Sequence, residues 1–212
     1  MRVVISGATG SIGSMLMARL SKSHDVTGLG RNQNKIKAMS HSYQMQSCDL
    51  ESKEFEEIIA DADCFIHCAA YAAPKGTVTQ FQKNVDITDA VIPVLQHHDV
   101  FTIFVSSASV FDAMPRDSIM TSPSIRPTSL YSKSKYDAEQ AVLNSSYENW
   151  TGLRPRAVIG EGDNTVRPRL EKLIKRKKII IPGRGDALLD YTCMENFLDC
   201  VEAVSYTHLT LP

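Results

Sequence analysis

The chain has 212 residues, of which 43% are hydrophobic and 22% charged, with a formal net charge of −1. This supplies a folded core for one large domain, or one domain and part of another. It excludes the basic surface that nucleic acid or an anionic membrane requires, and no apolar run approaches the length of a membrane span. Scattered cysteines and the lack of a secretory signal predict a cytoplasmic protein.

Short apolar runs alternate with helical patterns along the first three quarters of the chain. The predicted strands are 2–6, 25–30, 43–48, 63–70, 100–107 and 150–155. The predicted helices are 11–22, 52–60, 80–98 and 130–147. This alternation predicts an α/β fold with a Rossmann-type, doubly wound parallel sheet over residues 1–155.

The character of the chain changes after residue 155. A basic helix "RPRLEKLIKRKK", then "IIIPG" and "LLDYT", and a last helix "MENFLDCVEAV" follow. We interpret residues 156–204 as the start of a small, incomplete substrate-binding region. The ending "SYTHLTLP" (205–212) has neither helical nor strand periodicity, and we expect it to be a non-native tail; the alternative is a frayed terminus.

A glycine-rich turn, "SGATGSIG", joins the first strand to the first helix. Its spacing is G-x-x-G-x-x-G, which permits a tight turn, close approach of a pyrophosphate and close contact between helix and strand. The helix N-terminus adds free N–H groups and its positive dipole end. The turn therefore predicts a dinucleotide site, unless it serves only to bring helix and strand together. The predicted contacts here are Gly7, Thr9, Gly10, Ser11, Ile12 and Gly13.

Residues after the second and third strands indicate which dinucleotide binds. An acidic residue after the second strand would favour NAD, but the sequence there reads "GLGRNQNK". Arg31, with Lys35 close by, suits the 2′-phosphate of NADP, so we expect NADP rather than NAD. The alternative for Arg31 is a solvated loop residue. Asp49 and Leu50 of "CDL" are expected near the adenine; Asp49 is alternatively the N-cap of the next helix.

Two tyrosines have a lysine four residues later. Pro74 lies inside the Tyr71/Lys75 pair and disfavours a helix there. The segment "YSKSKYDAEQAVL" has no breaker, so Tyr131 and Lys135 are expected on one helix face. A nearby ammonium favours the phenolate and lowers the pKa of a tyrosine, which can then exchange a proton with a substrate oxygen during hydride transfer.

The fifth strand ends in two serines. Strand C-termini line the ligand crevice of a doubly wound sheet, so a hydroxyl of Ser106 or Ser107 can polarise a substrate oxygen there.

With "GATGSIG", "CDL", "IHCAA", "SSASV", "YSKSK" and "LRPRAVIGEGD" in family order, the chain resembles the extended short-chain dehydrogenases/reductases, the NAD(P)-dependent epimerase/dehydratase superfamily. The resemblance implies a catalytic triad of Ser107, Tyr131 and Lys135, with Lys135 also holding the nicotinamide ribose. Ser107, rather than Ser106, occupies the family's position before "ASV".

The same resemblance assigns four further positions near the cofactor. Ala69, Ala70 and Pro155 are expected to line it, and Asn84 is expected to be an accessory active-site residue. The alternative for Asn84 is a cap at a helix start. The implied assembly is a homodimer paired through the helices at 80–98 and 130–147.

The resemblance implies an NAD(P)-dependent oxidoreductase acting on a small secondary alcohol or ketone. Ala108 and Ser109 stand where nucleotide-sugar 4,6-dehydratases carry Asp-Glu, and Phe111 and Asp112 stand where epimerases commonly carry Tyr-Gly. "LRPRAVIGEGD" and "DYTCMENFLDCV" are most similar to the 3β-hydroxysteroid dehydrogenase-like branch. The alternatives are a nucleotide-sugar epimerase and a non-catalytic, NADP-sensing regulator.

Three other patterns are assigned no chemistry. "CFIHC" is expected to be a buried strand rather than a metal site, because Cys64 and Cys68 face away from His67 on a strand. His97 and His98 end a helix. The basic run is expected to be a solvated helix face, with binding of a substrate diphosphate as the alternative. Its members are Arg167, Arg169, Lys172, Lys175, Arg176, Lys177 and Lys178.

Overall fold

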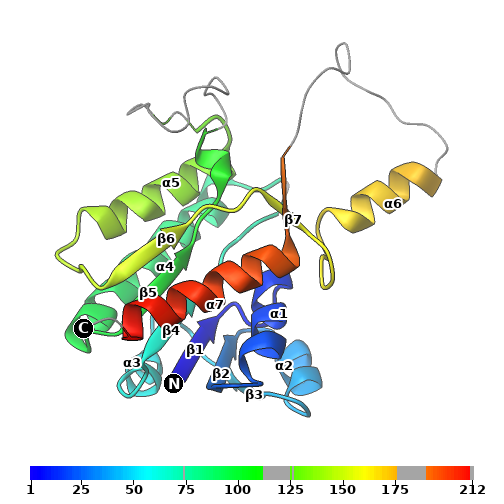
Figure 1. The fold of residues 1–212 in the computed structure, drawn as a ribbon. Coiled ribbons are helices and arrows are strands. Elements are labelled where there is room, and N and C mark those ends of the chain that lie inside the picture. The colour runs from blue at the N-terminus through cyan, green and yellow to red at the C-terminus, as the bar shows by residue number, and fades with distance from the viewer. Residues whose placement is uncertain (74, 112–124, 126, 176–189, 211–212) are drawn as a thin grey trace.

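The main sheet of the computed structural model has six parallel strands in the order β3-β2-β1-β4-β5-β6 (Figure 1). The structure describes all residues except 74, 112–124, 126, 176–189 and 211–212. The strands are β1 (Arg2–Ser6), β2 (Asp25–Gly30), β3 (Gln44–Ser47), β4 (Cys64–His67), β5 (Phe101–Val105) and β6 (Trp150–Leu153).

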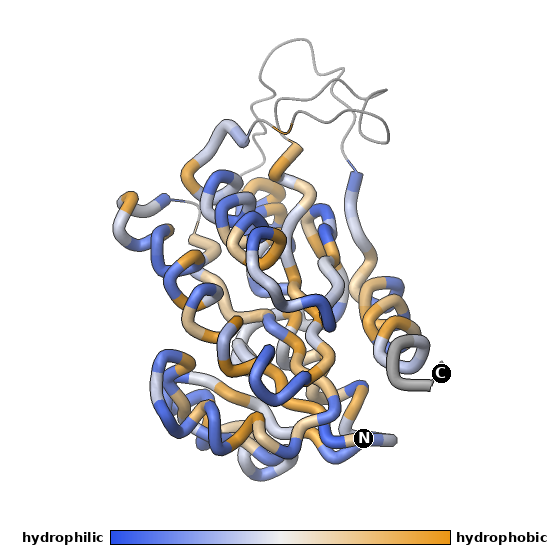
Figure 2. The backbone as a smooth tube through the Cα atoms, turned by 90° about the vertical axis from the view of Figure 1, so that its left-hand side faces the viewer, coloured by the Kyte–Doolittle hydropathy of each residue, from blue (hydrophilic) through white to orange (hydrophobic). Residues whose placement is uncertain are grey.

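Helices cover both faces of this sheet. They are α1 (Ser11–Leu20), α2 (Gln33–Met39), α3 (Lys53–Ile59), α4 (Val78–His97), α5 (Leu130–Leu143) and α7 (Met194–Thr210), with a 3₁₀ turn, η1 (Ala108–Phe111). Hydrophilic and hydrophobic residues alternate along the outer helices (Figure 2), as expected for helices that bury one face. None of the helices in the described part of the chain is both long and apolar enough to cross a membrane.

Two hydrophobic cores lie on the two faces of the sheet. One joins β1 to α1 and α7 through residues such as Ile5, Leu16 and Phe197. The other joins the sheet to α3 and α4 through residues such as Phe55 and Val91. Strands buried on both faces explain the nearly continuous apolar runs of β4 and β5.

The strand order reverses between β1 and β4, because β1 pairs with β2 on one side and with β4 on the other. The connections after β1 and β4 therefore leave in opposite directions, which opens a crevice at the carboxyl edge of the sheet. This topology confirms the predicted Rossmann-type, doubly wound parallel sheet.

A smaller parallel sheet of β7 (Ala157–Ile159) and β8 (Tyr191–Cys193) follows, with α6 (Arg167–Lys175) between its strands in sequence. The last helix, α7, returns to the main sheet, and its buried residues belong to the core around β1. Helix α7 also continues past residue 204. The prediction that the ending lacks helical structure was wrong for residues 205–210, where buried Ser205 donates to the carbonyl of Val201 at 2.8 Å.

Local signals explain most differences between the expected and observed elements. Helix α2 was missed because it is one short turn longer than a loop, although its cap is readable: the Asn32 side chain accepts from the N–H of Lys35. Helix α4 begins two residues early, because Thr77 and Gln80 form a capping box. Helix α5 ends at Leu143 rather than at 147, since Asn144 forms its C-cap.

Gly13 brings α1 against β1. A Cβ at this position would lie 2.3 Å from the carbonyl oxygen of Gly7 and 2.8 Å from Cα of Ala8. Both contacts are to backbone, so neither atom can yield without moving the glycine turn. This geometry explains why the third glycine of the motif faces the strand.

We expect Gly13→Ala to destabilise the fold by about 1–3 kcal/mol, because the overpacked methyl outweighs the gain in helix propensity. Urea denaturation measures the difference. Gly152→Ala is the control: there a Cβ would meet only the side chain of Trp150, at 3.3 Å, and stability should change little. Equal midpoints for the two variants would contradict this account of the turn.

Candidate active site

The glycine turn has the geometry that a pyrophosphate requires. Gly7 has φ of +66°, and a Cβ there would lie 2.7 Å from the backbone nitrogen of Ala69. Gly10 is the N-cap of α1 and makes no side-chain cap, so the helix N-terminus is left to the crevice. A Cβ on Gly10 would meet only the Gly7 carbonyl oxygen, at 3.1 Å, so its other side is open. The residues present thus fit a bound dinucleotide.

Two adjoining cavities lie along the carboxyl edge of the sheet. The larger, of about 1280 Å³, runs from the glycine turn to α5 and α6, and the smaller, of about 320 Å³, lies beyond β2 and β3. Each predicted cofactor and catalytic residue lines at least one of them. The larger is lined by Gly7, Gly10, Ser11, Ile12, Gly13, Ala70, Ser107, Tyr131, Lys135 and Pro155, and the smaller by Gly7, Thr9, Gly10, Arg31, Asp49, Leu50, Ala69, Ala70 and Asn84.

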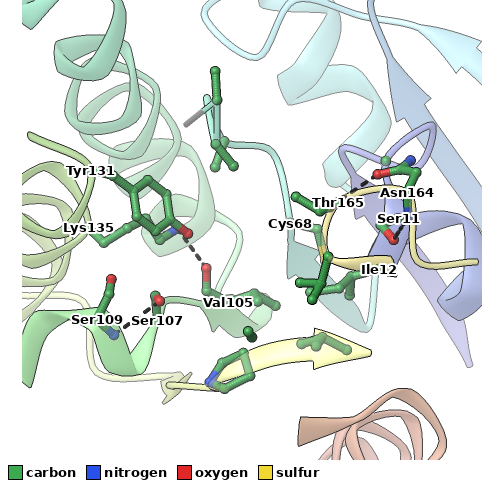
Figure 3. A pocket seen from close by; sticks show the side chains of 18 of the residues that line it. Ser11, Ile12, Cys68, Val105, Ser107, Ser109, Tyr131, Lys135, Asn164 and Thr165 are labelled. Carbon is green, nitrogen blue, oxygen red and sulfur yellow. Dashed lines mark hydrogen bonds between the residues drawn. The ribbon is translucent and has the colours of Figure 1, made fainter. Parts of the chain in front are cut away.

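Lys135 is held at the base of the larger cavity (Figure 3). Its helix is fixed at the start by a capping box between Ser129 and Ser132. The ammonium nitrogen donates to the carbonyl oxygen of Val105, the last residue of β5, at 2.7 Å. Burial lowers the pKa of Lys135 to about 8, against smaller opposing effects of Cys68 and Glu139.

Tyr131 lies one turn before Lys135 and also faces the cavity. Burial raises the pKa of Tyr131, and a side-chain hydrogen bond with Ser107 opposes that rise. The expectation that the lysine lowers this pKa is contradicted in the cofactor-free chain. The physical reason is that desolvation of the phenolate dominates while the ammonium of Lys135 is engaged by Val105.

Three serine hydroxyls follow β5 into the same cavity. The hydroxyl oxygen of Ser107 accepts from the N–H of Ser109 at 3.2 Å (Figure 3). The hydroxyl oxygens of Ser106 and Ser109 are buried and have no hydrogen-bond partner among the described residues. Unpartnered buried hydroxyls are costly, so they indicate groups that a ligand can engage. Ser109 was not among the predicted site residues.

Asn84 belongs to the middle of α4 and is 3% exposed. Its side-chain oxygen accepts from the N–H of Tyr71 at 2.6 Å, and its amide donates to the hydroxyl of Ser134 at 2.9 Å. The alternative of a helix-start cap was wrong, because Thr77 caps α4. Asn84 instead ties the loop after β4 to α5.

The remaining alternatives separate in a similar way. Asp49 is not the N-cap of α3; that position belongs to Ser52. The pair Tyr71/Lys75 lies in the loop between β4 and α4, where the phenol of Tyr71 donates to the carbonyl of Lys75 at 3.3 Å. Two residues on which sequence arguments rested, Pro74 and Asp112, lie outside the described residues.

The patterns that were assigned no chemistry are buried or remote from the crevice. His67 is buried in β4, its Nδ1 lies 2.9 Å from the hydroxyl of Ser6, and burial lowers its pKa to about 3. Among the described residues, three possible metal-ligating side chains come together only at Glu56, His97 and His98, outside both cavities.

The larger cavity is also lined by basic residues from the region after β6. They are Arg156, Arg169 and Lys172. Arg169 and Lys172 come from the predicted basic run, whose last three members, Arg176, Lys177 and Lys178, lie outside the described residues. The sequence identified the run but could not show which of its members turn toward the crevice.

The buried ammonium of Lys135 costs stability, and we expect Lys135→Met to stabilise the chain by about 1–3 kcal/mol near pH 7. The folded pKa, about 8, is below the ordinary 10.5. The unfolded chain therefore binds the extra proton between these values, and wild-type stability rises with pH across that window. The advantage of the variant should be full below pH 8 and fade toward pH 10. Urea unfolding of both proteins at each pH tests this; a pH-independent difference would contradict it.

Comparisons with known proteins agree with this fold and site. The NAD dependent epimerase/dehydratase family model matches residues 3–208. A 2-alkyl-3-oxoalkanoate reductase of Stenotrophomonas maltophilia (strain K279a) is 24% identical over 208 residues, and the uncharacterized protein YbjS of Escherichia coli (strain K12) is 28% identical over 212 residues. Each alignment covers 92% of this chain, which spans 62% of the relative's length.

Solved structures share the fold at lower identity. The UDP-glucuronic acid 4-epimerase of Bacillus cereus in complex with NAD superposes with a TM-score of 0.80 and 21% identity, covering 96% of this chain and 73% of that one. The NAD-dependent NDP-hexosamine 5,6-dehydratase TunA gives a TM-score of 0.81 at 22% identity, covering 96% and 71%. With the glycine turn, the strand order and the family match along nearly the whole chain, this protein belongs to the NAD dependent epimerase/dehydratase family.

Proposed function

We propose that the chain carries the dinucleotide half and part of the substrate site of an NAD(P)-dependent oxidoreductase that interconverts a secondary alcohol and a ketone. The observation that carries this proposal is the convergence of Ser107, Tyr131 and Lys135 on one cavity that begins at the glycine turn. The hydride is supplied or accepted by the nicotinamide when the cofactor is bound. The chain's own residues supply the proton and the polar contacts.

Tyr131 donates its phenolic proton to the carbonyl oxygen during reduction and takes it back during oxidation. A raised pKa keeps the phenol protonated at neutral pH, which suits the reducing direction. Ser107 holds the substrate oxygen beside the phenol. Lys135 holds the cofactor ribose, and once its ammonium turns from Val105 toward the phenol it favours the phenolate that proton transfer leaves.

A 3-oxo compound is the substrate class that we propose first. The 2-alkyl-3-oxoalkanoate reductase is among the curated relatives, and a ketone reductase needs only the one acid/base that α5 provides. The residues at the 4,6-dehydratase positions, Ala108 and Ser109, offer no second carboxylate.

We propose a preference for NADP at the same site. Arg31 and Lys35 follow β2 and line the smaller cavity, where two cations suit a 2′-phosphate. The acidic residue that would bind the ribose hydroxyls of NAD is absent from the end of β2. Several solved relatives were determined with NAD, so the choice of cofactor is to be measured.

A nucleotide-sugar epimerase is the second candidate. Arg156, Arg169 and Lys172 line the cavity that contains Tyr131, and such cations can hold a substrate diphosphate. Interconversion of sugar nucleotides without net oxidation of the cofactor would favour it. A non-catalytic NADP sensor would instead bind the cofactor and turn over none of these substrates.

The remaining expectations stay predictions. They are a small substrate region within residues 156–204, a non-native ending over 205–212, a cytoplasmic location and a homodimer paired through α4 and α5.

For cofactor choice, we expect Arg31→Ala to weaken NADPH binding roughly 10- to 100-fold, because a charge-assisted contact to phosphate contributes about 1.5–3 kcal/mol. NADH binding should change less than about threefold. Calorimetric titration measures both. Lys37→Ala, an exposed lysine of α2 outside both cavities, is the control. Equal losses for the two cofactors would contradict a phosphate site at Arg31.

For the chemistry, Tyr131→Phe should lower the rate of ketone reduction by about 10²- to 10⁴-fold, because the proton donor is lost. NADPH affinity should stay near the wild-type value. The assay follows NADPH consumption with ethyl 2-methyl-3-oxobutanoate and, separately, conversion of UDP-glucose. Tyr43→Phe, outside both cavities, controls for loss of a phenol. Full activity in Tyr131→Phe would exclude the mechanism.

A further inference from the structure

Glu139 lies one turn beyond Lys135 on α5, and its carboxylate is buried. Residues at i, i+4 and i+8 share a helix face, so Tyr131, Lys135 and Glu139 form one line along α5. Glu139 is 8% exposed, and a buried carboxylate requires a partner. Arg154 provides it: Nε donates to the two carboxylate oxygens at 2.9 and 3.0 Å, and Nη2 donates to Oε2 as well. This forked contact fixes the direction of the carboxylate as well as its position.

Arg154 also touches the segment that carries Ser107. It directly follows β6, and its guanidinium carbon lies 5.0 Å from the ring centroid of Phe111, the last residue of η1. The next residue, Pro155, accepts at its carbonyl from the N–H of Ala108 at 2.9 Å. The Arg154 side chain therefore lies between α5 and the turn that begins immediately after Ser107.

The charges around Lys135 give Glu139 a second property. At the end of β4, burial lowers the pKa of His67 to about 3 and raises that of Cys68 to about 12, so both are neutral near pH 7. On α5, burial keeps the phenol of Tyr131 neutral as well. Among the described groups that act on Lys135, the carboxylate of Glu139 is thus the formal negative charge, and it acts against the burial that lowers the pKa of the lysine.

We propose that Glu139 and Arg154 are positioning residues for the reaction: their ion pair holds the helix of Tyr131 and Lys135 against the turn of Ser107, and the Glu139 carboxylate supplies the negative charge next to the Lys135 ammonium. The proposal rests on the proposed function, because it assigns the pair to the same three reacting side chains. Neither residue touches the reacting atoms.

The ion pair predicts effects of opposite kind on charge and on position. Glu139→Gln removes the negative charge and leaves Arg154 nearby, so the pKa of Lys135 should fall below that in the wild type. Arg154→Lys retains both charges but loses the forked contact, so the pKa of Lys135 should stay where it is while positioning is weakened. A pair that only stabilised the fold would not distinguish these two variants.

The first measurement uses no substrate. The full chain, labelled with ¹³C at lysine Cε, is titrated by NMR with and without Glu139→Gln, and Lys135→Arg assigns the resonance. Asp137→Asn is the matched control: it breaks the exposed pair in which Lys133 Nζ lies 2.6 Å from an Asp137 oxygen, on the same helix. We expect a lower pKa of Lys135 in Glu139→Gln alone. An unchanged pKa in that variant would overturn the proposed electrostatic role.

The second measurement is the pH profile of ketone reduction with ethyl 2-methyl-3-oxobutanoate. Both Glu139→Gln and Arg154→Lys should reduce kcat roughly 10- to 100-fold, the usual cost of misplaced reacting groups. Only Glu139→Gln should move the alkaline limb to lower pH. Wild-type rates in both variants would overturn the positioning role. Should the wild type itself reduce no ketone, the proposed function fails, and the NMR titration still decides the effect of Glu139 on Lys135.

Discussion

A buried ammonium held by the last carbonyl of a central strand fixes the geometry of the candidate site. Lys135 reaches from α5 to Val105 at the end of β5, and this contact sets the height of α5 along the carboxyl edge of the sheet. Tyr131, one turn earlier, is thereby placed beside Ser107, which follows the same strand. The contact has a cost, because burial disfavours the charge, and the neighbouring carboxylate of Glu139 offsets part of it.

The glycine turn and the substrate region meet through one short contact. The hydroxyl of Ser11, at the start of α1, donates to the carbonyl of Gly162 at 2.6 Å and accepts from the N–H of Asn164 at 3.4 Å (Figure 3). Asp163 in turn accepts from the N–H groups that open α6. The residues expected at the pyrophosphate and the helix that carries Arg169 therefore belong to one connected edge of the crevice.

The sequence was sufficient for the fold and for the membership of the site. Periodicity identified each strand of the main sheet, and the motifs located the residues that line the two cavities, because both depend on local spacing. It was not sufficient for quantities that arise from tertiary contact. The dominance of burial over Lys135 in setting the pKa of Tyr131, the hydrogen bonds of Asn84 in the middle of α4, and the return of α7 to the core involve partners far away in the chain. Ser109 was missed because only its burial without a partner marks it.

The central claim is that one crevice brings the nicotinamide to Tyr131. A crystal structure of the full chain with NADPH tests it most directly. The account predicts the pyrophosphate at Gly10, the adenosine phosphate beside Arg31, and the nicotinamide ring next to the phenol of Tyr131, with Lys135 on the ribose. A cofactor bound elsewhere, or a nicotinamide ring directed away from α5, would contradict it.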